Sequence, residues 1–367
     1  MDESARVRLY HRTRRILSVA GFILDLALLL ALIFAGWSIS LRNFAERVTP
    51  HPPLALLIYL VLVGLIFDVP SLPLSYLRGY WLEHRYGVSN LTFWKWVKDE
   101  LKGLALGVTL AVLGIELIYW TIRNWPDNWW IISAAAFVTF FILLANLAPV
   151  LLFPIFFKFK PVEDPALTER LMELSRRART RVHGVFEWKL SERSKKSNAA
   201  LVGLGNTRRI ILSDTLLANF TGEEVEAVLA HEFGHHVHHH VFRSIVIQTV
   251  TTFLGFYLAN VCLENWGPAL GFRGVEDFAN LPLFVLVSMA LSLVLLPCIN
   301  MHSRWLERQA DDYAVNNIAN KSAFITSMEK LAELNLAERR PAAWIEFIFH
   351  SHPSIEKRIA RAQSIAA

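Results

Sequence analysis

The chain has 367 residues, of which 54% are hydrophobic, with 12 Trp, 24 Phe and a net charge of +5. This composition is too apolar for a typical soluble enzyme. Only two cysteines are present, Cys262 and Cys298, so no disulfide framework supports the fold. We attribute the positive charge to membrane topology and anionic lipid rather than to nucleic-acid binding.

Six apolar stretches are long enough, or nearly so, to cross a bilayer core, which takes roughly 20 residues. They cover about Ile16–Leu41, Leu54–Tyr76, Leu104–Ile122, Trp129–Phe157, Val241–Leu263 and Leu281–Met301. The alternative, that some are buried core helices, has more weight for the last two stretches than for the first four. The pattern predicts a mainly α fold, a polytopic membrane helical bundle with about six transmembrane helices.

Basic residues are concentrated before the first span and between the second and third, with few in the other early loops. The positive-inside rule therefore predicts a cytoplasmic N-terminus, and it places residues 158–240 and everything after Met301 on the same side. The first span has no evident cleavage site after it and is expected to remain as an anchor. We expect an integral, multi-pass protein with both termini in the cytoplasm. Its many Arg residues and the absence of retrieval signals favour a bacterial inner membrane over an endoplasmic reticulum membrane.

Three acidic residues, Asp25, Asp68 and Glu116, fall inside predicted spans. Acids there are energetically expensive and usually have a reason. They either line a water-filled cavity or pair with basic or backbone groups of the bundle.

After the fourth span the pattern changes to that of a small α+β unit. We predict a helix over Pro165–Arg179 and strands over Val185–Leu190, Asn198–Gly203 and Arg209–Ser213, with a turn at Leu204–Thr207 between the last two. Residues 1–160 then form an N-terminal membrane domain of four spans. Residues 161–367 form a second domain, which includes spans at about 241–263 and 281–301.

The most informative motif is His231-Glu232-Phe233-Gly234-His235, which reads H-E-x-x-H. A helix starting at a Thr221 and Glu224 capping box would place both imidazoles on one face, where they can hold one metal ion. Glu232 lies beside them and can take a proton from a water that the metal activates. Since no Gly or Pro cluster follows, we expect this helix to run directly into the fifth span. The motif predicts a cytoplasmic zincin-like metalloprotease domain with one catalytic Zn²⁺.

A catalytic zinc commonly has three protein ligands, so a third must be found. The fifth span carries the chain to the far side of the membrane. The first carboxylates after its return include Glu307 and Asp311, which are four residues apart on a predicted helix. We assign Glu307 as the third ligand and Asp311 as the hydrogen-bond acceptor of a ligand histidine. The alternative is a surface helix with scattered charge.

Further histidines follow the motif closely: His236, His238, His239 and His240. Helical spacing spreads them around the axis, so a polar collar near the membrane is favoured over a second metal site. The strand over Asn198–Gly203 is a candidate edge that pairs with an extended peptide substrate, and the alternative is an ordinary structural hairpin.

Several motifs together resemble the type I CAAX prenyl proteases, a family of integral-membrane zinc endopeptidases, over nearly the whole chain. The similar segments are Glu83–Thr92 with Lys98-Asp99, Ser194–Ala199, Arg209–Leu217, the motif helix Ala230–His240, Glu307-x-x-x-Asp311, and Ser351-His352-Pro353 with Arg358. The chain departs from the eukaryotic pattern in having six predicted spans instead of seven.

The resemblance implies roles for four further residues. His352 would help to polarise the substrate carbonyl, Arg358 would brace the site, and Asn198 and Ala199 would border the substrate strand. It also implies a large chamber within the membrane and removal of a C-terminal tripeptide from prenylated proteins.

The expected partners are a peptide or protein substrate, prenylated or not, and the lipid bilayer. One alternative is a quality-control metalloprotease that cuts misfolded membrane proteins. A more distant one is a non-hydrolytic transporter or lipid-binding bundle.

Overall fold

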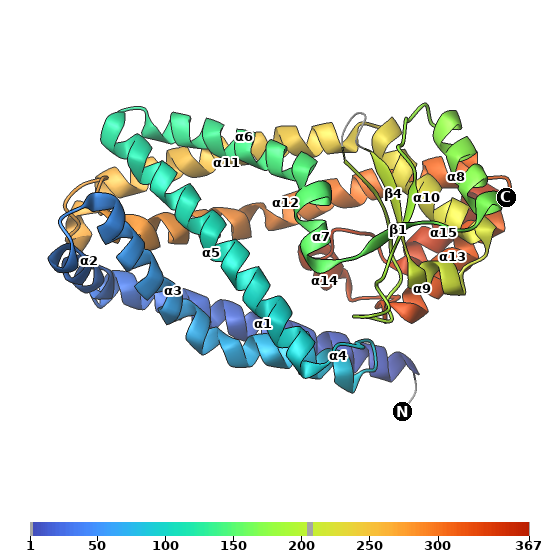
Figure 1. Cartoon of the computed structure of the whole chain (residues 1–367), viewed down its shortest axis with the longest axis horizontal. Helices are drawn as coiled ribbons and strands as arrows, with labels where there is room; N and C mark the ends of the chain where they lie inside the picture. The colour runs from blue at the N-terminus through green and yellow to red at the C-terminus, as the bar shows by residue number, and fades with distance from the viewer. Residues whose placement is uncertain (1–2, 204–207, 367) are drawn as a thin grey trace.

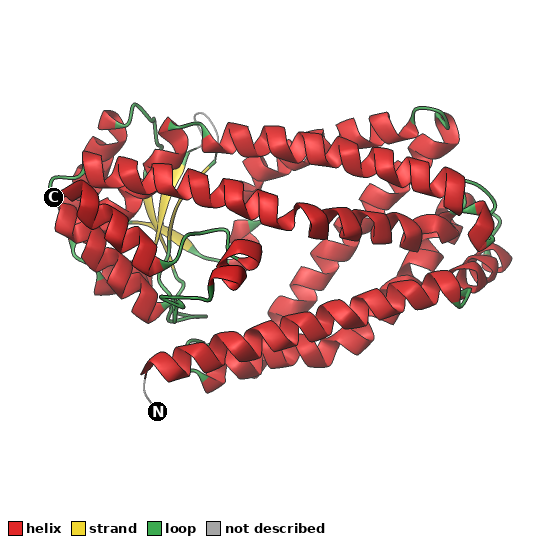
Figure 2. Cartoon of the chain, turned by 180° about the vertical axis from the view of Figure 1, so that it is seen from behind, coloured by secondary structure: helices red, strands yellow, loops and turns green. Residues whose placement is uncertain are grey.

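The computed structural model describes residues 3–203 and 208–366. Long helices make up most of the molecule, and a small sheet with its covering helices lies at one end (Figure 1). The same division into a helical bundle and a small α+β part is visible from behind (Figure 2). The prediction of a mainly α membrane bundle joined to a small α+β unit is therefore confirmed.

The N-terminal part is entirely helical. Its elements are α1 (Glu3–Phe34), α2 (Trp37–Val48), α3 (Pro52–Tyr76), the π-helical turn η1 (Leu77–Trp81), α4 (Leu82–Arg85), α5 (Phe93–Asn124), α6 (Trp129–Leu151) and α7 (Phe153–Phe156).

The second part begins with the sheet and returns twice through the bundle. Its elements are β1 (Phe159–Pro161), α8 (Pro165–Arg177), β2 (Val185–Trp188), β3 (Ala199–Val202), β4 (Arg209–Ser213), α9 (Asp214–Asn219), α10 (Gly222–Val237), α11 (His240–Trp266), the 3₁₀ turns η3 (Pro268–Leu270) and η4 (Phe278–Asn280), α12 (Leu281–Asn317), α13 (Lys321–Leu334), α14 (Ala343–Phe349) and α15 (Ile355–Ala366).

Six helical stretches of the described chain are long and apolar enough to cross a membrane. They are Ala5–Phe34, Pro52–Arg85, Phe93–Asn124, Trp129–Ala148, His240–Trp266 and Phe278–Asn317. Large apolar side chains such as Val294 and Leu113 point outward from them, as lipid contact requires. The predicted number of spans is confirmed.

The predicted bounds of two spans were wrong. The stretch over Ile16–Leu41 is not one helix, because α1 ends at Phe34 and Gly36 takes the left-handed conformation, with φ of 71°, that commonly ends a helix. The chain then turns into the separate helix α2. Likewise, the stretch over Trp129–Phe157 breaks after Leu151 and continues only as the short helix α7.

The expectation that the motif helix runs directly into the fifth span was also wrong. The helix α10 ends at Val237, and His239 takes a left-handed conformation with φ of 55° before α11 begins at His240. No Gly or Pro marks this break, because here a histidine adopts the left-handed conformation that usually favours glycine.

The four strands form one sheet in the order β1-β2-β4-β3, so β3 lies at an edge. The strands β3 and β4 are antiparallel, with Ala199 opposite Leu212, while β2 and β4 are parallel. The predicted strands are confirmed, but β1 was not anticipated, and the predicted turn at 204–207 lies outside the described residues. The helices α8, α10 and α13 cover the sheet with a buried apolar core that includes Leu171, Leu212, Phe233 and Phe324.

The acids in the spans have different surroundings. Asp68 lines an otherwise mostly apolar cavity of about 450 Å³ between α1, α3, α5 and α12. Glu116 lies 4.0 Å from Arg123 of the same helix. Glu116 thus fits the pairing interpretation, whereas Asp68 lines a cavity whose walls are otherwise apolar.

Candidate active site

The motif helix α10 starts where the sequence predicts. The Thr221 side chain accepts a hydrogen bond from the Glu224 backbone amide, and the Glu224 carboxylate accepts one from the Thr221 amide. This capping box satisfies two amides that would otherwise lack partners. Two turns later, His231 and His235 point toward the same place, as their i and i+4 positions require.

Gly234 allows α10 to approach α12 closely. A Cβ atom at this position would lie 2.8 Å from the Cα of Ala310 and 3.0 Å from its carbonyl oxygen. Because both obstacles are backbone atoms, no rotamer change could relieve the clash. The close approach brings Glu307 and Asp311, on either side of Ala310, to the motif histidines.

The structure gathers the three predicted metal ligands. Nε2 of His231 lies 3.2 Å from Nε2 of His235, and the two Glu307 carboxylate oxygens lie 3.3 and 3.4 Å from these nitrogens. Oε2 of Glu307 is buried and has no hydrogen-bond partner. A buried carboxylate that faces two imidazole nitrogens and has one oxygen without a partner fits a divalent metal ion of the kind that imidazole and carboxylate ligands hold.

Asp311 and Arg358 lie behind this group. Oδ1 of Asp311 lies 2.8 Å from Nδ1 of His231, and Arg358 donates two hydrogen bonds to the same carboxylate, at 2.6 and 2.9 Å. Asp311 is 2% exposed. A hydrogen bond from Nδ1–H to this carboxylate leaves Nε2 of His231 free to face the metal position.

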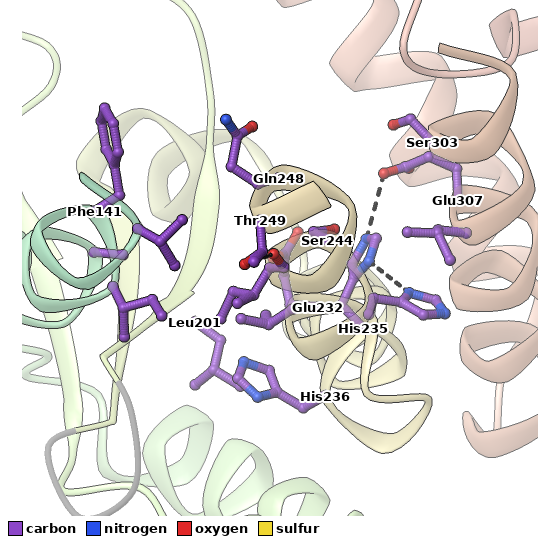
Figure 3. A pocket seen from close by; sticks show the side chains of 17 residues that line it. Phe141, Leu201, Glu232, His235, His236, Ser244, Gln248, Thr249, Ser303 and Glu307 are labelled. Carbon is purple, nitrogen blue, oxygen red and sulfur yellow. Dashed lines mark hydrogen bonds and ion pairs between the residues drawn. The ribbon is translucent and has the colours of Figure 1, made fainter. Parts of the chain in front are cut away.

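Glu232 and His352 lie close to the three ligands. Glu232 lines a cavity of about 710 Å³ together with His235 and Glu307 (Figure 3). Burial raises the pKa of the Glu232 carboxyl above its ordinary value, against the opposing effect of the two imidazoles. Nε2 of His352 lies 3.3 Å from Oε1 of Glu307. A carboxyl with a raised pKa is suited to accepting a proton and then releasing it.

The cavity continues toward the membrane-spanning helices. A second cavity of about 570 Å³ shares Phe141 and Gln248 with the first, and its lining is mostly apolar, with residues from α5, α6, α11 and α12. The site thus opens toward an apolar space inside the bundle.

The edge strand β3 borders the same cavity. Leu201 lines it beside Glu232 and His236 (Figure 3). Ala199 is buried in the strand, and Asn198 precedes it with an exposed side chain. The Ser213 amide donates a hydrogen bond to the Asn198 carbonyl, and the Asn198 amide donates one to the Ser213 hydroxyl, which holds this end of the strand against β4.

Sequence reasoning missed the contacts that hold the segment before β3. Lys196 donates a hydrogen bond of 2.7 Å to Glu83, which also accepts one of 2.5 Å from Tyr10 of α1. The backbone of Ser197 is held at both its amide and its carbonyl by the Asn335 side chain. Glu83 and Lys196 stand in two of the segments that resemble the prenyl proteases, but their pairing over 113 residues left no local signal in the sequence.

The histidines after the motif do not form a second cluster of metal ligands. Within the described residues, His231, His235 and Glu307 are the one group of three or more potential ligands that converge. His240 lies close to His235 instead of joining a polar collar, and it is 2% exposed. The i+5 spacing of the two residues does not predict this contact on a continuous helix. The contact arises because the helix breaks at His239.

Comparison with known proteins agrees with this geometry. Residues 161–366 match the model of peptidase family M48, and residues 2–158 match the model of the CAAX prenyl protease N-terminal region, described as five membrane helices. The chain is 28% identical to the uncharacterized metalloprotease YhfN of Bacillus subtilis, over 99% of this chain and 86% of that protein. It is 28% identical to CAAX prenyl protease 1 of Saccharomyces cerevisiae, over 96% of this chain and 84% of that protein.

A solved structure has the same fold. The crystal structure of S. mikatae Ste24p matches with a TM-score of 0.87 and 25% identity, over 98% of this chain and 89% of the other. A transporter or lipid-binding bundle without hydrolytic activity does not agree with these matches. The chain therefore belongs to peptidase family M48 and is a membrane-embedded metalloprotease.

Proposed function

We propose that the protein is a zinc endopeptidase that cleaves prenylated peptides near their C-terminus, at a site on the cytoplasmic side of a bacterial inner membrane. His231, His235 and Glu307 hold the metal ion. The observation that carries the metal assignment is the convergence of two imidazole nitrogens on the buried Glu307 carboxylate, one of whose oxygens has no hydrogen-bond partner. Two nitrogen ligands and one oxygen ligand form a set common to catalytic zinc sites.

When bound, zinc supplies Lewis acidity, which polarises a peptide carbonyl and makes a water acidic near neutral pH. Glu232 accepts the proton of the attacking water and later delivers it to the leaving amine. His352, 3.3 Å from Glu307, is placed to donate a hydrogen bond to the carbonyl oxygen as negative charge develops on it. Asp311 and Arg358 keep His231 in the tautomer that the ligand role needs.

The substrate backbone would lie along the outer edge of β3, bordered by Asn198 and Ala199. Edge pairing uses main-chain hydrogen bonds and so binds peptides with little regard for their side chains. A preference between substrates must then come from elsewhere in the site.

The apolar cavity supports a substrate that carries an apolar group. It adjoins the catalytic cavity at Phe141 and Gln248, and at about 570 Å³ it is in the size range of small-molecule sites. A prenyl chain there would bury its hydrocarbon while the peptide lies on β3. The names of the relatives in yeast, rice and Arabidopsis, all CAAX prenyl proteases, point to the same substrate class.

The cytoplasmic location is supported by the basic residues in the first turns of α1 and from η1 to the first turns of α5. In this proposal the N-terminal membrane domain ends at residue 160, and residues 161–367 form the metallopeptidase domain, with two of the six spans.

Purified protein should be offered a farnesylated CAAX peptide, the same peptide without the prenyl group, and an unfolded membrane protein, each with and without a chelator. We expect chelator-sensitive cleavage with a clear preference for the farnesylated peptide. Equal cleavage of both peptides would refute prenyl recognition. Cleavage of the unfolded membrane protein alone would instead establish a quality-control protease.

A further inference from the structure

The second motif histidine, His235, has an unusual neighbour. Its Nδ1 lies 2.9 Å from Nδ1 of His240, the first residue of α11, and the two rings meet edge to face. A dashed line in Figure 3 marks the contact of His235 with Glu307 on its other side. Both nitrogens of the His235 ring are therefore engaged, one toward the metal position and one toward His240.

The far side of His240 is also held. Its Nε2 lies 2.9 Å from Oε1 of Gln309, and Nη1 of Arg243 donates a hydrogen bond of 3.2 Å to the same oxygen. A guanidinium can only donate, so Arg243 requires the oxygen of the Gln309 amide, not its NH₂ group, to face this point.

That requirement determines which nitrogen carries each proton in this series of hydrogen bonds. An amide oxygen can only accept, so Nε2 of His240 carries a proton and donates it to Gln309. Nδ1 of His240 then has a lone pair and accepts the proton on Nδ1 of His235. With that proton on Nδ1, Nε2 of His235 presents its lone pair beside Glu307, as a metal ligand must.

We propose that His240, held by Gln309 and Arg243, is a positioning residue that fixes the tautomer and ring orientation of His235. The inference rests on the proposed role of His235 as a metal ligand. It gives each motif histidine its own partner: a carboxylate, Asp311, for His231 and a neutral imidazole for His235.

The proposal also gives the break between α10 and α11 a function. A continuous helix would place residue 240 five positions beyond His235, about 140° away around the axis at 3.6 residues per turn, and out of contact with it. The left-handed conformation of His239 breaks the helix, and the chain then brings His240 into contact with the ring of His235.

The decisive variant is His240→Phe, which keeps a buried ring and removes the acceptor. We expect its zinc dissociation constant to rise about 10–100-fold, the usual effect of losing a hydrogen-bond partner of a ligand. His240→Asn should restore most of the affinity, because the amide oxygen of Asn can occupy the position of Nδ1. His238→Phe is the matched control, since His238 stacks on His240 but stands outside the hydrogen-bond chain.

A second variant tests the same role without changing His240. Gln309→Leu frees His240 to switch tautomer and should weaken zinc binding in the same direction, by a smaller factor. The double variant His240→Phe/Gln309→Leu should bind zinc no worse than His240→Phe alone, because both changes break one chain. The thermal unfolding of the metal-free variants should match that of the metal-free parent.

Three results would each overturn the proposal. The first is wild-type zinc affinity in His240→Phe, and the second is an equal loss of affinity in His240→Asn and His240→Phe. The third is a loss of thermal stability in metal-free His240→Phe that matches its loss of zinc affinity. Glu307→Ala distinguishes this from a failure of the metal site itself. If Glu307→Ala loses zinc while His240→Phe keeps it, only the role of His240 fails. If Glu307→Ala also keeps its zinc, the proposed ligand set fails.

Discussion

The substitution Gly234→Ala tests whether the approach of α10 to α12 sets the geometry of the metal site. The added Cβ would lie 2.8 Å from the Cα of Ala310, whereas carbon atoms in contact are about 3.5–4.0 Å apart. The two helices must therefore separate locally by about 0.7–1.2 Å. Overpacking of this kind costs about 1–3 kcal/mol of folding free energy.

The shift matters more to the metal than to the fold. Glu307 lies three residues before Ala310 on α12, and metal–ligand distances tolerate changes of only about 0.2 Å. We expect Gly234→Ala to fold with a lowered Tm and to lose most of its metal on dialysis and most of its peptidase activity.

The assay measures metal content by mass spectrometry, together with Tm in detergent. Gly255→Ala is the control, because its Cβ would make an ordinary contact of 3.6 Å with the Leu291 side chain. We expect that variant to keep its metal. A Gly234→Ala protein with full metal content and activity would refute the claim that this contact sets the site.

Three further predictions address other parts of the site. Glu232→Gln should reduce cleavage by at least about 10²–10⁴-fold while the metal stays bound, measured by turnover and metal content on one sample; an active, metal-loaded variant would refute the role. Arg358→Leu leaves the Asp311 carboxylate buried without its cationic partner, and we expect a loss of about 3–5 kcal/mol in unfolding free energy and a lower Tm; an unchanged Tm would contradict this. Glu83→Gln removes the ion pair with Lys196, which holds the segment before β3, and should raise KM more than it lowers kcat. Glu192→Gln, which removes an exposed ion pair with Lys95, is the control. Equal effects of the two variants would contradict the prediction.

Features with a local signal could be predicted from the sequence. The spans are long apolar runs. The capping box and the H-E-x-x-H motif are each defined by residues a few positions apart. The assignment of Glu307 as a ligand required one long-range inference, because the chain returns to the side of the motif only after two spans.

Features that depend on backbone conformation or distant pairing could not be predicted. The breaks at Gly36 and His239 come from left-handed residues, and the one at His239 has no glycine to mark it. The Lys196–Glu83 contact joins a loop of the metallopeptidase part to the membrane part. The place of His240 beneath His235 depends on the break, so a continuous-helix prediction necessarily missed it.

A zinc K-edge X-ray absorption spectrum of the purified protein tests the proposed ligand set most directly. We expect one zinc per chain, with two imidazole nitrogens at about 2.0–2.1 Å and carboxylate oxygen at about 2.0–2.2 Å. Glu307→Ala should lose the metal or the carboxylate contribution. A spectrum without imidazole ligands, or one unchanged in Glu307→Ala, would contradict the proposed site.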